Sequence, residues 1–241
     1  MGLYSDVNSV LLIYLDSGFG LTKDARILEF ELTRLGKTVS HLKVGKQSKR
    51  RWGPIGHKTR SLPKPEKPHD LAIHIDIVSK YLLNQADRHT HMPNLEFFKV
   101  KFEWFYGCFD SVLAKTHETV DVLAKIKRGD FVGFRSEDHG MPGIAKDWDR
   151  FLHVAGGSRL KGTKWLLELW RRHPEWPELV VKHANRHDFG DFPQNVKEIT
   201  GHMSDQELKE LQNSFGIHLC PSEAEGYGQY LVEALSQARS R

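Results

Sequence analysis

The feature that most constrains the fold is a repeated alternation of short apolar runs, glycine-containing loops and helical periodicity. Its first instance is the apolar run at 9–14 (SVLLIY), which predicts a strand buried in a parallel sheet. A glycine loop at 16–20, a helix over 22–35 ended by Gly36, and a second strand over 39–44 are predicted to follow. This order of elements predicts the opening unit of a doubly wound α/β domain.

The same alternation continues and predicts one Rossmann-like domain over 1–140. Its further elements are expected to be strands at 70–75, 109–115 and 131–134, and helices at 78–83 and after Thr116. The segment 136–149 is polar and contains glycine and proline, so we expect it to be a linker between domains.

A second alternation predicts a partial Rossmann-like domain over 150–241. Its elements are expected to be a strand at 151–155, a helix through Trp170, a strand at 178–182, a capped helix and a strand at 217–220. The capped helix is opened by the capping box Ser204–Glu207, and we predict that it runs to Phe215 and is ended by Gly216.

Composition is that of an ordinary globular protein, with 39% hydrophobic and 27% charged residues among 241. There is no apolar run of about 18 residues, and the N-terminus lacks the pattern of a signal peptide. The cytoplasm is therefore the expected location. We expect Cys108 and Cys220, which both lie in apolar sequence, to be buried thiols and not a disulfide.

A basic segment runs from Lys43 to Lys67, with nine Lys or Arg and a single acidic residue, Glu66. Prolines and glycines break it, so we predict a loop. Two interpretations remain open: a solvated surface loop, or a basic patch that meets anionic lipid head groups or nucleic acid. Trp52 is its only aromatic residue, which is too little for stacking bases, so nucleic acid is not expected. If the segment has a partner, the expected contact is peripheral, with a membrane.

The stretch 221–238 (PSEAEGYGQYLVEALSQA) has the strongest features of a ligand site. Gly226 and Gly228 bracket a turn in which backbone N–H groups can approach a ligand, and a helix is predicted from Gly228. The positive end of that helix favours phosphate. Glu225 and Glu233 flank the turn, and carboxylates are good acceptors for sugar hydroxyls. A ligand that combines phosphate with hydroxyls suggests a sugar nucleotide.

The motif P-S-x-x-E-G-Y-G followed by E-A-L resembles the donor-site motif of retaining GT-B glycosyltransferases of the family-4 type. The segment 156–163 (GGSRLKGT) is similar to the glycine–basic–K-G loop of that family, and the elements after residue 151 come in the family's order. The resemblance implies two Rossmann-like domains that face a cleft, the second of them incomplete. It is diffuse before residue 151.

The resemblance also implies roles for individual residues. Lys161 and Arg159 would stabilise the departing diphosphate, although Arg159 stands closer to the lysine than in the family pattern. Glu225 would contact the transferred sugar, and Glu233 the ribose. The donor would be bound by Gly157, Gly226, Tyr227, Gly228 and Glu233. Two cations and a helix N-terminus can neutralise a pyrophosphate without a metal, so no metal and no cofactor are expected.

On the acceptor side the resemblance implies a role for the first glycine loop, with Gly18 and Gly20, and for a histidine of the first domain. We choose His74, a strand residue, for that histidine. The G-F-G loop lacks the third glycine of a dinucleotide fingerprint, so NAD is not expected. His89 and His91 form an H-x-H pair, but no third ligand at suitable spacing supports a metal site.

The implied reaction is transfer of a hexose from a nucleotide-diphosphate sugar to a hydroxyl of a saccharide or lipid-linked acceptor, with retention of configuration. Members of the family continue beyond the point that corresponds to Arg241. The sequence therefore leaves three possibilities open: a fragment of a longer enzyme, a chain completed by a partner, or a degenerate homologue. A weak or inactive binding module of glycosyltransferase descent and a GT-B sugar-nucleotide epimerase are the alternative functions.

Overall fold

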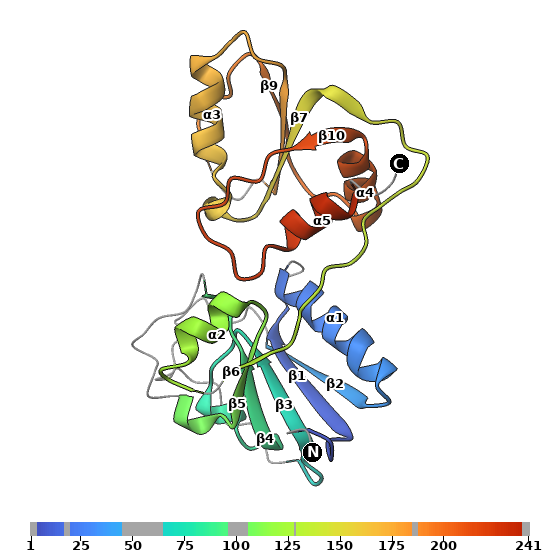
Figure 1. Ribbon diagram of the computed structural model, residues 1–241, viewed down its shortest axis with the longest axis vertical. Helices are drawn as coiled ribbons and strands as arrows, with labels where there is room; N and C mark the ends of the chain where they lie inside the picture. The colour runs from blue at the N-terminus through green and yellow to red at the C-terminus, as the bar shows by residue number, and fades with distance from the viewer. Residues whose placement is uncertain are drawn as a thin grey trace. The chain divides into compact units, whose positions relative to one another are not determined.

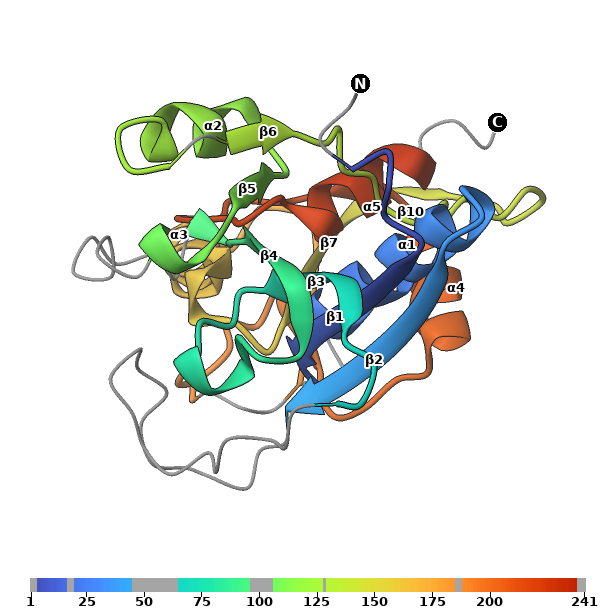
Figure 2. The same ribbon diagram turned by 90° about the horizontal axis from the view of Figure 1, so that it is seen from below.

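The computed structural model describes residues 4–16, 20–44, 65–95, 106–127, 129–184 and 188–237. The chain divides into two compact units, Met1–Arg135 and Ser136–Arg241. Each unit is built on its own parallel β-sheet, shown in Figures 1 and 2.

The first unit contains a six-stranded parallel sheet in the order β2-β1-β3-β4-β5-β6, with adjacent strands side by side in Figure 2. The strands are β1 (Ser9–Leu15), β2 (Thr38–Val44), β3 (His69–Ile75), β4 (Ala86–Met92), β5 (Ser111–Ala114) and β6 (Gly129–Phe131). The helical segments are α1 (Gly20–Arg34), the 3₁₀ turn η1 (Lys80–Leu82) and α2 (His117–Leu123). The order confirms the predicted doubly wound α/β fold.

The apolar runs of the central strands form the core of this unit. Val10 and Leu12 belong to one buried cluster, whereas Leu11 and Ile13 belong to another. Because successive side chains of a strand point to opposite faces, β1 is buried on both faces. This is why its sequence is continuously apolar and does not alternate.

Several predicted elements of the first unit differ from the structure. Helix α1 begins at Gly20, so Thr22 lies inside it, where its hydroxyl donates to Asp16 Oδ1 at 3.1 Å. The helix expected at 78–83 is only the short turn η1. Strand β6 ends at Phe131, where a strand over 131–134 was expected to begin. Both thiols are free, as predicted, but Cys108 is exposed and Cys220 is only half-buried, so the predicted burial was wrong for Cys108 and only partly right for Cys220.

The second unit contains a four-stranded parallel sheet in the order β10-β7-β8-β9. The strands are β7 (Asp147–Gly156), β8 (Leu179–His183), β9 (Val196–Ile199) and β10 (Phe215–His218). The helical segments are the 3₁₀ turn η4 (Arg159–Lys161), α3 (Thr163–Arg172), α4 (Asp205–Asn213) and α5 (Gln229–Gln237). Figure 1 shows α3 on one side of this sheet and α4 on the other.

The two faces of β8 explain this layering. Leu179 and Val181 pack with Leu166, Leu167 and Trp170 of α3. Val180, which points to the opposite face, packs in a cluster with Leu152 and Phe215 against which Leu211 of α4 also lies. Each helix therefore covers one apolar face of the sheet.

The capping box that opens α4 is present: Ser204 Oγ accepts from Glu207 N, and the Glu207 carboxylate accepts from Ser204 N. The predicted end of this helix was wrong. Helix α4 stops at Asn213, and Phe215 and Gly216 belong to β10. Gly216 is needed there because a Cβ would lie 2.3 Å from the ring of Trp148. Gly216, which we predicted to end the helix, instead allows the Trp148 ring to pack against β10.

Candidate active site

Two loops of the second unit meet at one edge of its sheet. One follows β7 and includes η4, and the other runs from the end of β10 to α5. Strands β7 and β10 are parallel neighbours, so their carboxyl ends lie at the same edge, where doubly wound sheets bind ligands. A backbone hydrogen bond of 2.8 Å from Glu223 N to Leu160 O joins the loops directly.

Gly162 fixes the distance between the two loops. Its φ of 74° lies in the left-handed region, between η4 and α3. A Cβ at this position would lie 2.1 Å from the backbone oxygen of Pro221. Only glycine therefore permits both the conformation and the close approach of the second loop.

The contact made possible by Gly162 brings four polar side chains together. Lys161 Nζ lies 2.5 Å from Glu225 Oε1, and the Ser222 hydroxyl also bonds to that carboxylate oxygen. Ser222 Oγ is in turn 2.5 Å from the hydroxyl of Tyr230. The Lys161 ammonium lies 3.8 Å from the centre of the Tyr230 ring, a cation–π contact.

The site is partly buried, and its charges are still accessible. The side chains of Lys161 and Glu225 keep 18% and 21% of their exposure, so a ligand can reach both. Tyr230 is buried, and this burial raises the pKa of its hydroxyl to about 12. Burial likewise raises the pKa of the neighbouring Cys220 thiol to about 11, so this cysteine is a neutral thiol at pH 7. Of the side chains in this contact, Lys161 and Glu225 are the two that carry a charge.

His153 of β7 forms a hydrogen bond to a residue at the border of each loop. Its Nδ1 lies 2.9 Å from Leu219 O, which only accepts, so Nδ1 carries the hydrogen. Its Nε2 then accepts from the hydroxyl of Thr163, the first residue of α3, at 2.9 Å. Burial lowers the pKa of His153 to about 4, so the neutral ring is the form that makes these two bonds.

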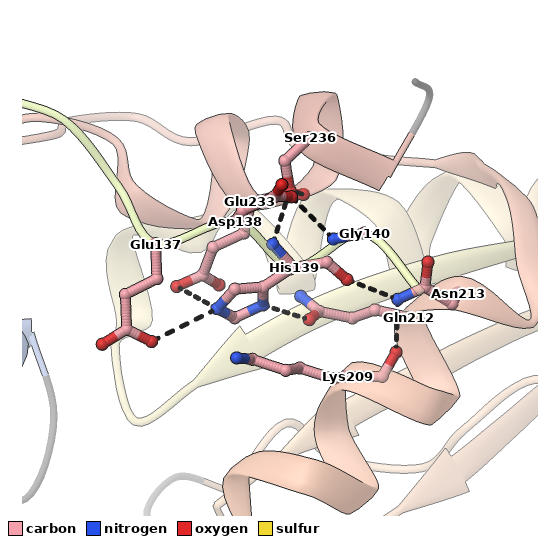
Figure 3. A network of polar contacts seen from close by, with 9 residues as sticks. All are labelled: Glu137, Asp138, His139, Gly140, Lys209, Gln212, Asn213, Glu233 and Ser236. Atoms are coloured by element: carbon pink, nitrogen blue, oxygen red, sulfur yellow. Dashed lines mark hydrogen bonds and ion pairs between the residues drawn. The ribbon is translucent and has the colours of Figure 1, made fainter. Parts of the chain in front are cut away.

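Glu233 lies on the buried face of α5 and is only 5% exposed. Its carboxylate is 3.7 Å from His139 Nε2 (Figure 3). His139 comes from the segment 136–149 that we expected to be a linker, and this part of it packs on α4 and α5 of the second unit. The two glutamates of the motif are thus held differently, Glu225 by Lys161 at the loop and Glu233 by its position inside the unit.

The other predicted donor residues occupy the same two loops. Gly228 has a φ of 85° and precedes α5, which starts at Gln229, close to the predicted start. Gly226 is buried, Tyr227 and Gly157 are half-buried, and Arg159 is exposed on η4. Their roles toward a donor stay predictions.

The predicted acceptor-side residues lie in the first unit. Gly20 is exposed at the start of α1, whereas Gly18 lies outside the described residues. His74 is completely buried, with Nε2 3.0 Å from His89 Nδ1 and its ring against Phe109. Burial and the neighbouring histidines lower the pKa of His74 well below its ordinary value. Its environment is that of a core histidine, and a role toward an acceptor stays a prediction.

Four residues that support the site were not singled out from the sequence: Ser222, Tyr230, His139 and His153. The first two stand inside the motif 221–238, so the motif itself was the signal that could have identified them. Among the residues that the structure describes, no group of three or more His, Cys, Asp or Glu is placed to hold a metal ion.

Comparison of the fold with solved structures finds several glycosyltransferases. A glycosyltransferase from Rickettsia africae has a TM-score of 0.67 at 12% identity, over 96% of this chain and 77% of that one. The lipopolysaccharide outer core galactosyltransferase WaaB has a TM-score of 0.60 at 16% identity, over 95% and 78%. The pneumococcal O-GlcNAc transferase GtfA, in complex with UDP and GlcNAc, has a TM-score of 0.50 at 11% identity, over 69% and 40%.

The chain thus spans about 40% of the length of GtfA and more than three quarters of the other two. No protein-family model matches the sequence, and no curated protein sequence matches it. At these identities the likeness concerns the fold. The chain has a mixed α/β fold with two Rossmann-like parallel sheets, and this fold matches that of the GT-B glycosyltransferases.

Proposed function

We propose that this chain transfers a sugar from a nucleotide-diphosphate donor to a hydroxyl acceptor with retention of configuration. The observation that carries the proposal is the pairing of Lys161 with Glu225 where two loops meet, next to the start of α5. A cation, a sugar-binding carboxylate and a helix N-terminus are then available to one ligand. Structures of similar fold whose complexes contain UDP support the same choice of ligand.

In the proposed mechanism the diphosphate replaces Glu225 as the partner of Lys161. Lys161, Arg159 and the amides around Gly228 stabilise the negative charge that develops on the leaving diphosphate. The bond from the anomeric carbon to the diphosphate oxygen breaks, and the acceptor oxygen bonds to that carbon on the same face. The acceptor proton passes to the departing phosphate oxygen, so the step needs no further base.

The released Glu225 carboxylate then accepts a hydrogen bond from a hydroxyl of the transferred hexose. Glu233 is assigned to the ribose. The cations of the loop take the part that a metal plays elsewhere, so activity is expected to survive a chelator. The acceptor would be a saccharide or a lipid-linked saccharide. None of the described helices is long and apolar enough to cross a membrane. The basic segment proposed to touch a membrane lies largely outside the described residues.

The test is a thermal-shift panel of UDP, GDP, ADP and their sugars on the wild type and on Lys161→Ala. A ligand at about 100 times its dissociation constant stabilises by roughly 2.7 kcal/mol, enough for a clear shift of the midpoint. A shift with one base that is lost in the variant supports the donor site. The anomeric configuration of the released or transferred sugar, read by NMR, then tests retention.

The same panel separates the alternatives. Binding without any turnover indicates a binding module, and a changed sugar still attached to its nucleotide indicates an epimerase. Absence of a shift with every nucleotide and every sugar nucleotide contradicts the proposed function.

A further inference from the structure

The segment around His139 is hydrogen-bonded to both α4 and α5 of the second unit. His139 N donates to Ser236 Oγ of α5 at 3.0 Å, and Asn213 Nδ2 of α4 donates to His139 O at 2.7 Å. Met141 N donates to Asn213 Oδ1 at 3.0 Å. Ser236 Oγ in turn donates to Glu233 O at 2.7 Å, so these bonds reach the residue that carries the second motif carboxylate.

The His139 ring lies between α4 and two carboxylates, as Figure 3 shows. Its Nδ1 is 3.1 Å from Gln212 Oε1, which only accepts, so Nδ1 carries a hydrogen. Its Nε2 faces Glu233 Oε1 at 3.7 Å and Glu137 Oε2 at 3.9 Å. The ring is 2% exposed, and Nε2 has no hydrogen-bond partner within the described part of the chain.

We propose that His139 is a positioning residue for Glu233. One ring nitrogen is fixed to α4, and this aims the other toward the Glu233 carboxylate, which is itself held inside the unit. When the ring is protonated, Nε2–H attracts the Glu233 carboxylate and thereby sets its direction. This inference rests on the proposed function, because it makes His139 a determinant of how tightly the ribose end of the donor is held.

Two substitutions separate positioning from packing. In His139→Asn the amide nitrogen can replace Nδ1 and keep the bond to Gln212, but the shorter side chain does not reach toward Glu233. In His139→Gln the longer side chain places an amide donor near the position of Nε2. His202→Gln is the matched control, since His202 is an exposed histidine of the same unit.

The binding of two ligands is compared. One is the nucleoside diphosphate selected by the thermal-shift panel, and the other is its 2′,3′-dideoxy analogue, which lacks the ribose hydroxyls. His139→Asn is expected to weaken the ribonucleotide about 10-fold and the dideoxy analogue less than about 2-fold. His139→Gln is expected to stay within about 3-fold of the wild type for both. Equal weakening of both ligands, or none at all, overturns the inference.

A double-mutant cycle between His139→Asn and Glu233→Gln decides the case in which the wild type binds no nucleotide. Coupling of about 3-fold or more in the unfolding equilibrium constant supports the positioning of Glu233. If the wild type binds no nucleotide and the two substitutions are coupled, the proposed function fails but the positioning role of His139 stands. Additive effects of the two substitutions overturn the positioning role, whatever the chain binds.

Discussion

Lys161 and Glu225 stand 64 residues apart in sequence, and their side chains form an ion pair of 2.5 Å. Each is the residue of its loop that the proposed reaction needs most. In the free protein they neutralise each other. A donor must therefore exchange this pair for two new contacts, diphosphate on the lysine and sugar on the glutamate. Their pairing allows both charges to remain partly buried without a ligand.

The ring of Tyr230 beneath the Lys161 ammonium leads to a first prediction. Tyr230→Leu removes the ring and is expected to weaken nucleoside-diphosphate binding by about 3- to 10-fold, the range of a partly buried cation–π contact. Tyr230→Phe keeps the ring, loses the hydroxyl with its bonds to Ser222 and Cys220, and is expected to weaken binding less. Calorimetric titration measures both. Equal losses in the two variants would mean that the hydroxyl matters and the ring does not.

Gly162 gives a prediction about stability. Gly162→Ala combines left-handed strain of about 1–3 kcal/mol with an overlap on the Pro221 oxygen. Gly143→Ala is the matched control, because Gly143 also has a positive φ but nothing lies within 4 Å of its Cβ position. The urea midpoint of unfolding should therefore fall further below that of the wild type in Gly162→Ala than in Gly143→Ala. Equal midpoints would contradict the close contact of the two loops.

A buried ion pair in the first unit gives a third prediction. Lys115 Nζ lies 2.8 Å from Asp24 Oδ2, with side-chain exposures of 1% and 4%, and it also bonds to Asn94. Lys115→Met removes one partner of this buried ion pair, at a cost of about 3–5 kcal/mol. Arg34→Met, which removes an exposed pair with Glu31, should cost no more than about 1 kcal/mol.

Adding Asp24→Leu to Lys115→Met should recover much of the lost stability, because both charges of the pair are then gone. Urea unfolding followed by circular dichroism gives the free energies. A Lys115 variant as stable as the Arg34 variant would show that the pair does not matter to the fold.

His153 predicts how stability depends on pH. Its pKa is about 4 in the folded chain, against 6.5 for an ordinary histidine, because the ring is buried. Between these values the unfolded chain binds more protons, so stability falls as the pH falls from about 6.5 to about 4. The full shift corresponds to roughly 3 kcal/mol. Urea unfolding at a series of pH values should give a flatter profile for His153→Gln than for His202→Gln, and identical profiles would contradict this account.

The elements of the fold were predictable where the local sequence carries one clear pattern, such as a continuous apolar run or a capping box. The apolar run of β1 is buried on both faces, and the capping box at Ser204 opens α4. Strand β4 was not predicted, because its histidines and threonine look polar although Thr90 and His91 are buried in the sheet. Gly216 was misread because a glycine that packs against a ring has the same sequence signal as one that ends a helix.

The candidate site was predictable where the motif carries the residues, as for Lys161 and Glu225. The role of Tyr230 depends on the distance between two loops, which Gly162 sets and no local pattern encodes. His139 was beyond prediction for the same reason: it stands in a polar segment, and its partners lie more than 70 residues further along the chain. Such contacts are properties of the tertiary structure.

The most direct test of the central claim is calorimetric titration with a nucleoside diphosphate and its monophosphate. If the loops around Lys161 hold the diphosphate, Lys161→Ala should weaken the diphosphate about 10- to 100-fold and leave the monophosphate nearly unchanged. Lys164→Ala, which removes an exposed lysine of α3, should bind both like the wild type. Diphosphate affinity that is the same in Lys161→Ala and the wild type would contradict the account.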